Sequence, residues 1–385
     1  MFHDQSSPEN DILFVVFNLE IGGAEWVIVN LCNSLADAGL SVTLLTNKEA
    51  PLCQEISSAV QVVYLSNNSR IHSYLRAFVK INHCLRRNRF RVIMTTQRNV
   101  SCLVCLAHWL CRSSAMMVVR AAASNVGASV AGMSKMKAFI RKQLMRWSYR
   151  HADLIVANSP GTRDAVLRNR LVGKSACVAT LRNPLNIRLI QQRACEESTI
   201  AVKDGCKHLV AIGRLTAQKQ FDDLICATER LIERGEKVQV SILGEGPLRS
   251  KLEDMIVNKG LSDFIQLVGK VPNPYPTLKT ADVFVLTSKF EGFGMVVVEA
   301  LALGVPVVAT DIPDGPRWIL SDGKFGALYP VGDVEQLVEC ISAVFRKRPL
   351  GEPLVERAWH YDRAAVARDF MKEFELVPLH SKPSP

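Results

Sequence analysis

Two carboxylates and two cations at short spacings are the residues of this sequence best suited to chemistry. Glu291 and Glu299 lie eight residues apart, and Arg214 and Lys219 lie five apart. Carboxylates accept hydrogen bonds from sugar hydroxyls, whereas the planar fork of Arg and the ammonium of Lys bind phosphate oxygens. This combination predicts a nucleotide-sugar site in which the cations hold the diphosphate and the acids hold the sugars.

The elements predicted around these residues place them at one edge of a sheet. An apolar strand at 208–213 precedes Arg214, and a helix at 295–303 follows the glycine-containing loop that begins with Glu291. Ligands of open α/β sheets bind at the carboxyl ends of the strands, and the first turn of a helix offers free N–H groups to an anion. Glu299, about one turn into the helix, is placed to accept hydrogen bonds from a ribose, and Glu291 from the transferred sugar.

Alternating apolar runs and helical periodicity predict an α/β fold with two doubly wound, Rossmann-like domains, which suits a length of 385 residues. Strands are predicted at 12–17, 41–46, 60–65, 92–96, 116–120 and 154–157 in the first domain, and at 208–213, 238–243, 264–268, 283–286 and 306–308 in the second. Helices are predicted at 24–38, 71–87, 100–111 and 136–150, and a further helical pattern covers 351–375. The linker falls near 182–184, which gives domains 1–183 and 184–354.

Composition indicates a protein of a reducing compartment without a membrane-spanning segment. No run of about 18 apolar residues exists, and residues 1–11 are polar and lack the apolar core of a signal peptide. The 11 cysteines are scattered, and the Cys-x-x-Cys pair Cys102 and Cys105 lies in an apolar helical stretch, so helix packing is favoured over zinc. Free cysteines on this scale predict a cytoplasmic location.

The net charge of +10 is concentrated in the first half of the chain. Residues 1–185 hold 22 Lys or Arg and 10 Asp or Glu, whereas residues 186–385 hold 25 and 27. The segment 56–152 contains 16 Lys or Arg and no acidic residue. Because a solvated surface normally mixes both signs, this asymmetry predicts an anionic partner for the first domain.

Within the acid-free segment, residues 133–150 form a basic amphipathic helical pattern. The apolar residues on or near one face are Met136, Phe139, Ile140, Leu144 and Trp147. For this helix alone two interpretations stay open: it lies in the plane of a membrane interface, or it packs its apolar face on the sheet. The length of the acid-free segment favours the first, so we expect peripheral binding to the anionic inner face of the cytoplasmic membrane.

Taken singly, an acid on a helix or an arginine after a strand is usually a surface residue. Here they occur in order with Gly22-Gly23-Ala24-Glu25, Gly213-Arg214-Leu215 and Gly244-Glu245-Gly246. In this order the chain resembles the family 4 retaining glycosyltransferases of the GT-B fold, and in particular bacterial polysaccharide, O-antigen and capsule transferases. The resemblance implies two Rossmann-like domains that face a cleft, with a C-terminal helix near 355–376 that crosses back onto the first domain.

The resemblance also implies roles for the site residues, with Arg214, Lys219 and Glu291 as the catalytic set. Donor contacts are expected from Gly22, Gly23, Arg214, Lys219, Gly244, Val271, Glu291, Gly292, Phe293, Gly294, Met295 and Glu299. On their own, the paired glycines after the first strand indicate only a tight turn. The sequence contains no Asp-x-Asp motif, so no metal and no cofactor are expected, and the cations with the helix N-terminus at Met295 would stabilise the leaving diphosphate.

Two departures from the family pattern concern the acceptor and the phosphates. Where many members have a His after the fifth strand this chain has Arg120, as some polysaccharide-assembly relatives do, which makes it a candidate acceptor or phosphate contact. In Asp314-Gly315-Pro316-Arg317 the usual following Glu is Trp318, and Arg317 is either a second phosphate contact or a surface residue at a helix start. His108 is interpreted as a packed or surface histidine.

The expected reaction transfers a hexose or N-acetylhexosamine from a nucleotide-sugar, expected to be a UDP-sugar, to a hydroxyl of a polyprenyl-diphosphate-linked or polysaccharide acceptor in surface glycan biosynthesis. No carboxylate stands out as a nucleophile, which favours a front-face mechanism in which a phosphate oxygen takes the acceptor's proton. One alternative is a GT-B enzyme that is not a transferase, such as a sugar-nucleotide epimerase, but the spacing of Glu291 and Glu299 with Lys219 favours the transferase. The other is a basic nucleic-acid-binding protein, for which no recognition motif exists.

Overall fold

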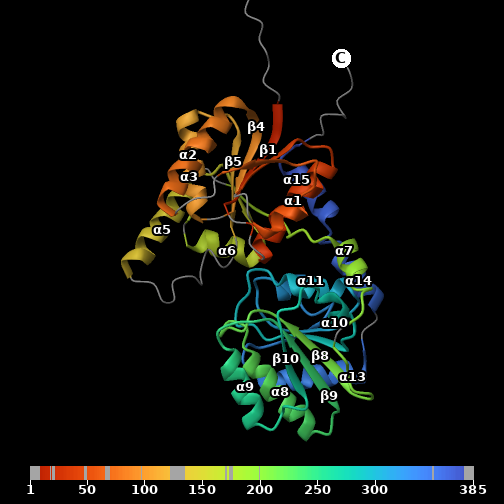
Figure 1. Ribbon diagram of the computed structural model, residues 1–385. Coiled ribbons are helices and arrows are strands. Elements are labelled where there is room, and N and C mark those ends of the chain that lie inside the picture. The colour runs from red at the N-terminus through yellow and green to blue at the C-terminus, as the bar shows by residue number, and fades with distance from the viewer. Residues whose placement is uncertain are drawn as a thin grey trace, which may run out of the picture. The chain divides into compact units, whose positions relative to one another are not determined.

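The chain forms two compact α/β units (Figure 1). The computed structural model describes residues 9–17, 19, 22–46, 50–65, 70–96, 98–121, 135–169, 171–172, 177–198, 200–348 and 351–376. The first unit comprises Met1–Leu185 with Arg363–Pro385, and the second comprises Asn186–Asp362. Along the chain the first of these boundaries lies at 185/186, beside the predicted division at 183/184.

The first unit is built on a seven-stranded parallel sheet with the strand order β3-β2-β1-β4-β5-β6-β7. Its strands are β1 (Glu9–Val15), β2 (Val42–Thr46), β3 (Gln61–Tyr64), β4 (Arg89–Thr95), β5 (Met116–Ala121), β6 (Leu154–Ala157) and β7 (Cys177–Thr180). Its helices are α1 (Gly23–Asp37), η1 (Pro51–Glu55), α2 (Arg70–Arg87), α3 (Arg98–Cys111), α5 (Lys135–Arg150), α6 (Pro160–Arg168) and α15 (Arg363–Glu373).

The second unit is built on a six-stranded parallel sheet with the strand order β10-β9-β8-β11-β12-β13. Its strands are β8 (Lys207–Ile212), β9 (Val238–Leu243), β10 (Ile265–Gly269), β11 (Val283–Leu286), β12 (Val307–Thr310) and β13 (Ala327–Tyr329). Its helices are α7 (Ile187–Arg193), α8 (Phe221–Glu233), α9 (Arg249–Asn258), α10 (Tyr275–Lys279), α11 (Met295–Ala302), α12 (Pro316–Ile319), α13 (Val334–Arg346) and α14 (Gly351–Trp359). The predicted class, two doubly wound α/β units, is confirmed.

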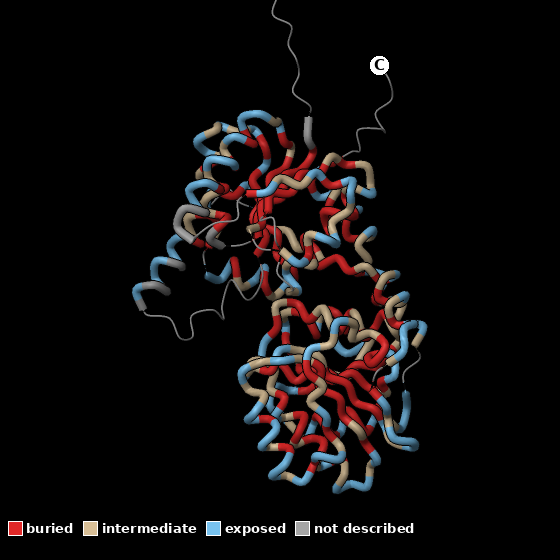
Figure 2. The backbone as a smooth tube through the Cα atoms, in the orientation of Figure 1, coloured by how far each residue is buried: buried red, intermediate tan, exposed pale blue. Residues whose placement is uncertain are grey.

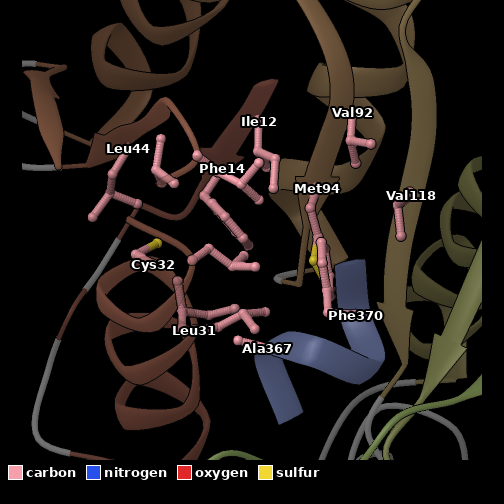
Figure 3. Close-up of a cluster of buried hydrophobic side chains, with 14 of the residues drawn as sticks. Ile12, Phe14, Leu31, Cys32, Leu44, Val92, Met94, Val118, Ala367 and Phe370 are labelled. Carbon is pink, nitrogen blue, oxygen red and sulfur yellow. The ribbon is translucent and has the colours of Figure 1, made fainter. Parts of the chain in front are cut away.

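Alternating side chains of β1 build separate cores on the two faces of the first sheet. Ile12 and Phe14 lie in a core with α1 and α15 (Figure 3), whereas Leu13 and Val15 lie in a core with α2, α3 and α5. The ring of Phe370 on α15 packs 6.5 Å from that of Phe14. The buried residues of both units follow this layered pattern (Figure 2), with the strands in the middle. Helix α15 is therefore part of the first unit's core although it comes last in the sequence.

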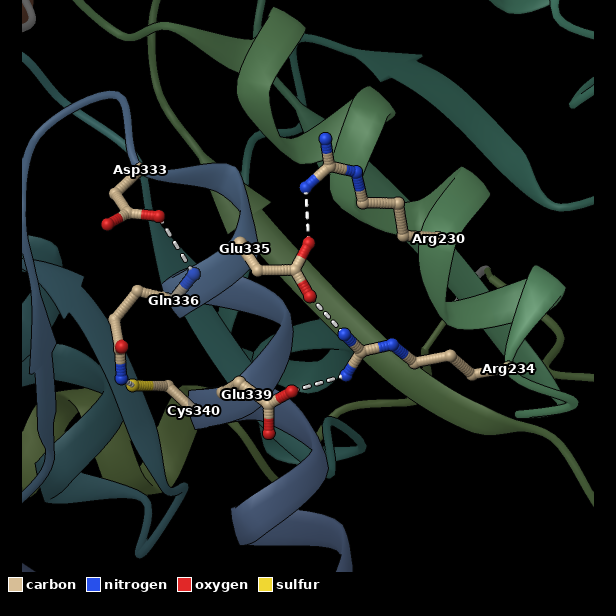
Figure 4. A network of polar contacts seen from close by, with 7 residues as sticks. All are labelled: Arg230, Arg234, Asp333, Glu335, Gln336, Glu339 and Cys340. Carbon is tan, nitrogen blue, oxygen red and sulfur yellow. Dashed lines mark hydrogen bonds and ion pairs between the residues drawn. The ribbon is translucent and has the colours of Figure 1, made fainter.

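A charged network on the second unit joins α8 to α13 (Figure 4). Arg230 donates to Glu335 at 2.5 Å, and Arg234 donates to Glu335 and, at 2.7 Å, to Glu339. All four side chains are exposed, so each pair stabilises the fold by only about 0–1 kcal/mol. The network fastens two helices and is not part of the sheet edge described below.

Two strands and one break differ from the predicted elements, and several helices, among them α6, α9 and α13, were not predicted. Strands β7 and β13 were not predicted; they are four and three residues long and only partly buried, so their apolar signal is weak. The helical pattern predicted at 351–375 is two helices, α14 and α15, which belong to different units. The backbone N–H of Arg363, the first residue of α15, donates to the carbonyl of Leu185 at 2.7 Å. This hydrogen bond ties together the two chain segments that connect the units.

Candidate active site

The loop between β8 and α8 carries both predicted cations. It follows Ile212 and ends at Gln220, whose backbone is left-handed with a φ of 44°. Lys219 lies across Gly213, because a Cβ added at Gly213 would come within 2.8 Å of the lysine Cε. Arg214 is exposed. The loop thus holds one cation against the protein and presents the other to solvent.

Lys219 forms an ion pair with Glu291. Its Nζ lies 2.6 Å from Oε1 of Glu291, and the hydroxyl of Ser288 donates to the same oxygen at 2.6 Å. The two charged side chains are only 14% and 10% exposed. Each charge therefore depends on the other, since a partly buried charge without a partner loses its hydration without compensation. The sequence predicted both residues for one site, and the structure brings them into direct contact.

Three hydrogen bonds lock this loop to the loop that follows β11. The hydroxyl of Thr287 donates to the carbonyl of Lys219 at 2.6 Å. The backbone N–H of Lys289 donates to the carbonyl of Gln218 at 2.8 Å, and the Gln218 side chain donates to the carbonyl of Phe290 at 2.8 Å. Because the two loops are fixed to each other, the ion pair occupies a prearranged position at the edge of the sheet.

The glycines of the GEGP segment allow a third loop to approach. A Cβ at Gly244, where φ is 143°, would lie 1.9 Å from the carbonyl oxygen of Gly213, and one at Gly246 would lie 2.4 Å from that of Leu215. The backbone N–H of Gly244 also donates to the carbonyl of Gly269 at 2.8 Å. These contacts give Gly244 a structural reason to be glycine, and they bring the ends of β8, β9 and β10 together.

The remaining predicted donor residues of this unit lie at the same edge. Val271 follows β10, and Gly292, Phe293 and Gly294 precede α11, which begins at Met295. Gly294 is the helix N-cap with a left-handed φ of 86°, a conformation that glycine adopts without strain. In the strand order β10-β9-β8-β11, the four strands whose ends carry these residues are direct neighbours. The second unit therefore gathers the predicted donor residues of these four loops at one edge of its sheet.

Glu299 is a partly buried carboxyl on α11. Burial raises the pKa of the Glu299 carboxyl to about 7. The pKa of the Tyr275 hydroxyl is also raised, mainly by burial and in addition by the charge of Glu299. No hydrogen bond joins the Glu299 carboxyl to another of the described residues. Near neutral pH the group is thus divided between its charged and neutral forms, and its hydrogen-bonding capacity is available to a ligand.

Glutamine at position 299 should make the protein more stable in mild alkali. The folded protein holds the Glu299 proton more tightly than the unfolded chain, so this stabilising contribution is complete below pH 4.5 and is lost as the pH rises through about 7. Glu299→Gln cannot ionise, and at about pH 8 we expect its free energy of unfolding to exceed that of the wild type by up to about 3 kcal/mol, with a smaller difference at about pH 5. Urea unfolding at the two pH values measures this. The exposed Glu356→Gln is the control, and a Glu299→Gln variant that is less stable at the higher pH would contradict the assignment.

An aromatic cluster packs against the loop that contains Glu291 and Phe293. The rings of Phe293, Trp318 and Tyr361 meet edge to face, with centroids 5.8–6.2 Å apart. Arg357 donates to the Trp318 carbonyl and the Tyr361 hydroxyl, at 2.8 and 3.0 Å, and its guanidinium lies over the Tyr361 ring. A Cβ at Gly315 would lie 1.9 Å from the Phe293 carbonyl oxygen, so the Gly-Pro-Arg segment packs directly on the loop. This places Trp318 in a packing role.

Arg317 is engaged in a surface ion pair. Its Nε and Nη2 donate to the two carboxylate oxygens of Asp311 at 2.6 and 2.5 Å, and these hydrogen bonds raise the arginine pKa. Of the two predicted roles, this geometry matches that of a surface residue near a helix start. His108 is also accounted for, because its Nε2 lies 2.8 Å from the carbonyl oxygen of Ala115.

The other predicted residues lie in the first unit. Gly22 is the N-cap of α1 and Gly23 is its first residue. A Cβ at Gly22 would come within 2.5 Å of a carboxylate oxygen of Glu25, so the side chain of Glu25 folds back over the start of its own helix. Arg120, the second-last residue of β5, is buried. These residues lie at the carboxyl ends of β1 and β5, at the ligand-binding edge of the first sheet.

The helix predicted at 133–150 exposes its apolar face. It is observed as α5, and residues 133 and 134 lie outside the described part of the chain. Met136, Phe139, Ile140 and Leu144 are 47–68% exposed, whereas Met145 on the other side is buried. Trp147, the fifth residue of the predicted apolar face, packs against the core of the first unit, so four of the five residues are exposed and one is packed. None of the helices in the described part of the chain combines the length and the hydrophobicity that a membrane-spanning segment needs.

Two further helices of the first unit also expose large apolar residues. Large apolar residues are also exposed on α2 and α3, namely Tyr74, Leu75, Val79, Trp109 and Leu110. Helix α3 contacts both α2 and α5. None of the three helices contains an Asp or Glu. We call this set of exposed residues on α2, α3 and α5 the three-helix surface; the α2 and α3 parts were not predicted, although the acid-free segment included both.

Ser288, Tyr361 and Arg357 were also not foreseen. Ser288 precedes Glu291 by three residues, and a hydroxyl at that spacing is common in loops and carries no signal by itself. Tyr361 and Arg357 lay in a segment assigned to a single helix. Their contacts with the Glu291 loop join residues far apart in the sequence, which periodicity does not reveal.

Comparisons with known proteins agree with this arrangement. Residues 21–178 match the family described as Glycosyltransferase Family 4, and residues 196–360 match Glycosyl transferases group 1. The chain is 32% identical to an N-acetylgalactosaminyltransferase of Campylobacter jejuni that acts on a diphospho-undecaprenol-linked sugar, over 60% of this chain and 63% of that protein. It is 26% identical to the lipopolysaccharide core biosynthesis glycosyltransferase LpsE of Rhizobium meliloti, over 94% of this chain and 97% of that protein.

A solved structure shows the same fold over nearly the whole chain. HepE of Anabaena superposes with a TM-score of 0.74 at 17% identity and covers 95% of this chain and 100% of its own. The two family matches cover both units, and each match includes its unit's predicted site residues. The chain therefore belongs to the family 4 glycosyltransferases of the GT-B fold.

Proposed function

We propose that the protein is a retaining glycosyltransferase that moves a hexose or N-acetylhexosamine from a UDP-sugar to a lipid-linked glycan in surface glycan biosynthesis. The observation that carries this proposal is the Lys219–Glu291 ion pair at the carboxyl edge of the second sheet, where Arg214 lies in the same loop as Lys219 and Glu299 lies on the helix that follows the Glu291 loop. HepE was solved with UDP and with UDP-glucose, and the Campylobacter jejuni relative uses a polyprenyl-diphosphate acceptor. These names support a nucleotide donor and a lipid-linked acceptor for this chain.

In the proposed reaction the bond between the anomeric carbon and the diphosphate oxygen breaks, and an acceptor hydroxyl oxygen bonds to the same face of that carbon. The acceptor's proton passes to a phosphate oxygen. Arg214 and Lys219 neutralise the charge that develops on the leaving diphosphate, and Lys219, which its ion pair already holds in place, does not need to reorganise as the bond breaks. No metal is assigned a role.

The two glutamates would orient the donor. Lys219 and Ser288 both contact Oε1 of Glu291, which leaves Oε2 for a hydroxyl of the transferred sugar. Glu299 would accept hydrogen bonds from the ribose in its charged form. Because burial raises the pKa of Glu299 to about 7, donor binding should strengthen as the pH rises through that value. Backbone groups at Val271 would contact the base.

A lipid-linked acceptor lies in a membrane. We propose that the enzyme binds this anionic membrane through the three-helix surface. Exposed apolar residues on α5 can enter the interface while exposed cations such as Lys142 and Arg150 meet the headgroups. The comparisons give no support to the epimerase or to the nucleic-acid-binding alternative.

A screen of nucleotide-sugars by thermal unfolding and by transfer tests the proposed function. At a concentration of about 100 times the Kd, a ligand stabilises the folded state by about 2.7 kcal/mol, so a true donor should raise Tm clearly. We expect a UDP-sugar to raise Tm. The dialysed enzyme should transfer its sugar to an acceptor even in the presence of EDTA. NMR of the product should show that the anomeric configuration is unchanged. Loss of activity in EDTA that Mg²⁺ or Mn²⁺ restores would refute metal independence. If no nucleotide-sugar shifts Tm, the donor assignment is wrong.

A further inference from the structure

Arg120 is a buried cation at the substrate edge of the first sheet. Only 4% of the residue is exposed, and burial lowers the pKa of its guanidinium to about 10, an effect that the carboxylate of Glu25 partly opposes. A buried charge without a close partner costs several kcal/mol, so a purely structural arginine is expected to have an ion pair and a full set of hydrogen bonds.

Among the described residues, the guanidinium of Arg120 has neither an ion pair nor a full set of hydrogen bonds. Its Nη2 donates to the side-chain carbonyl of Asn183, a neutral and equally buried residue. Its Nη1 is buried and has no hydrogen-bond partner among the described residues, and none of the described carboxylates lies within ion-pair distance. Asn183 is itself held in place, because the neighbouring carbonyl of Pro184 accepts a hydrogen bond from Asn30 on α1 at 3.2 Å.

The surroundings of Arg120 are those of a ligand site rather than of a core. It is the second-last residue of β5, and in the strand order β1-β4-β5 it lies at the same edge as the start of α1. The N-cap of α1 is Gly22, which has no side chain to cap the helix, and the carboxylate of Glu25 lies over the first turn. Parallel α/β sheets bind their ligands at this edge.

We propose that Arg120, through its Nη1, binds a negatively charged group of the sugar substrate. The inference rests on the proposed function and adds a substrate class to it. Two groups share this chemistry, a phosphate of the lipid-linked acceptor and the carboxylate of an acidic sugar, and both can accept hydrogen bonds from two guanidinium N–H groups. A guanidinium at this position thus makes a negative charge part of what the enzyme recognises in its substrate.

Thermal unfolding in saturating UDP tests the proposal, because UDP occupies the donor site of the second unit. Inorganic phosphate, glucuronate and neutral glucose are added separately at constant ionic strength to the wild type, Arg120→Gln, Arg120→Lys and the exposed control Arg168→Gln. We expect phosphate or glucuronate, but not glucose, to raise Tm of the wild type and of the control. The response should be lost in Arg120→Gln and need at least about tenfold more anion in Arg120→Lys, whose point charge cannot form the paired contact.

The anion that acts identifies the source: phosphate alone indicates the acceptor phosphate, and glucuronate alone indicates an acidic sugar. Without anion, Arg120→Gln should unfold at or above the wild-type Tm, because an uncompensated buried charge is removed. The proposal is overturned if neither anion acts on the wild type, or if Arg120→Gln responds like the control; should Arg120→Gln fail to fold, an unchanged response in Arg120→Lys overturns it. If UDP itself does not shift Tm, the donor assignment fails separately.

Discussion

Alanine in place of Lys219 should lower both kcat/KM and stability. Loss of a charged hydrogen bond to the leaving diphosphate costs about 1.5–3 kcal/mol, which corresponds to a decrease in kcat/KM of about 10- to 150-fold. The same substitution leaves Glu291 with Ser288 as its remaining contact among the described residues. Breaking a fully buried ion pair costs about 3–5 kcal/mol, which is an upper limit here because both side chains keep some exposure.

A second variant separates these two effects. Adding Glu291→Gln to Lys219→Ala removes the unpaired charge, so stability measured by urea unfolding should recover while kcat/KM stays low. Lys251→Ala, which removes an exposed lysine of the same unit, is the matched control and should change neither quantity. A Lys219→Ala enzyme with wild-type kcat/KM would show that this lysine does not contact the donor in the transition state.

The sequence predicted those parts of the fold whose signals are local. Strands that are mostly buried, such as β9 and β11, were placed at their observed bounds, since a buried parallel strand is a largely apolar run. Strand β7 is as short as β11, but β7 and β13 are only partly buried and were missed because they lack a clear apolar run. Helix α15 was merged with α14 because both have helical periodicity, and tertiary contacts such as that of Phe370 with β1 show that α15 belongs to the other unit.

The candidate site was predicted as a set of residues but not as a set of contacts. Motif order identified Lys219 and Glu291, yet nothing in the sequence indicated that these residues, 72 positions apart, form an ion pair in the absence of a donor. The exposure of Phe139 on α5 was equally hidden, because periodicity shows that a helix has an apolar face and not which face packs on the protein. Tertiary contacts decide both questions.

Reversal of two charges on α5 should detach the protein from anionic membranes. The variant Lys142→Glu with Arg146→Glu reverses two charges on α5, the helix that exposes Phe139 and Ile140. Each cation near an anionic surface contributes about 1 kcal/mol, so loss of two should weaken binding by about 30-fold, and the two new carboxylates should weaken it further. Sedimentation with vesicles that contain phosphatidylglycerol, at low and high salt, measures this. The wild type should bind, and salt should reduce the bound fraction because it screens the charges.

Two controls distinguish membrane insertion from attraction by net charge. Lys251→Glu with Lys347→Glu makes the same change of net charge on exposed residues of the second unit and should bind nearly as the wild type does. Phe139→Ser with Ile140→Ser keeps every charge but removes two exposed apolar side chains. Burying such a side chain yields about 1.5–3 kcal/mol, so this variant should bind weakly even at low salt. The membrane prediction is contradicted if the protein does not bind anionic vesicles at low salt and if a soluble oligosaccharide is as good an acceptor as a lipid-linked one. The three-helix surface would then have another partner. If binding follows net charge alone and survives the serine substitutions, the apolar residues do not enter the bilayer.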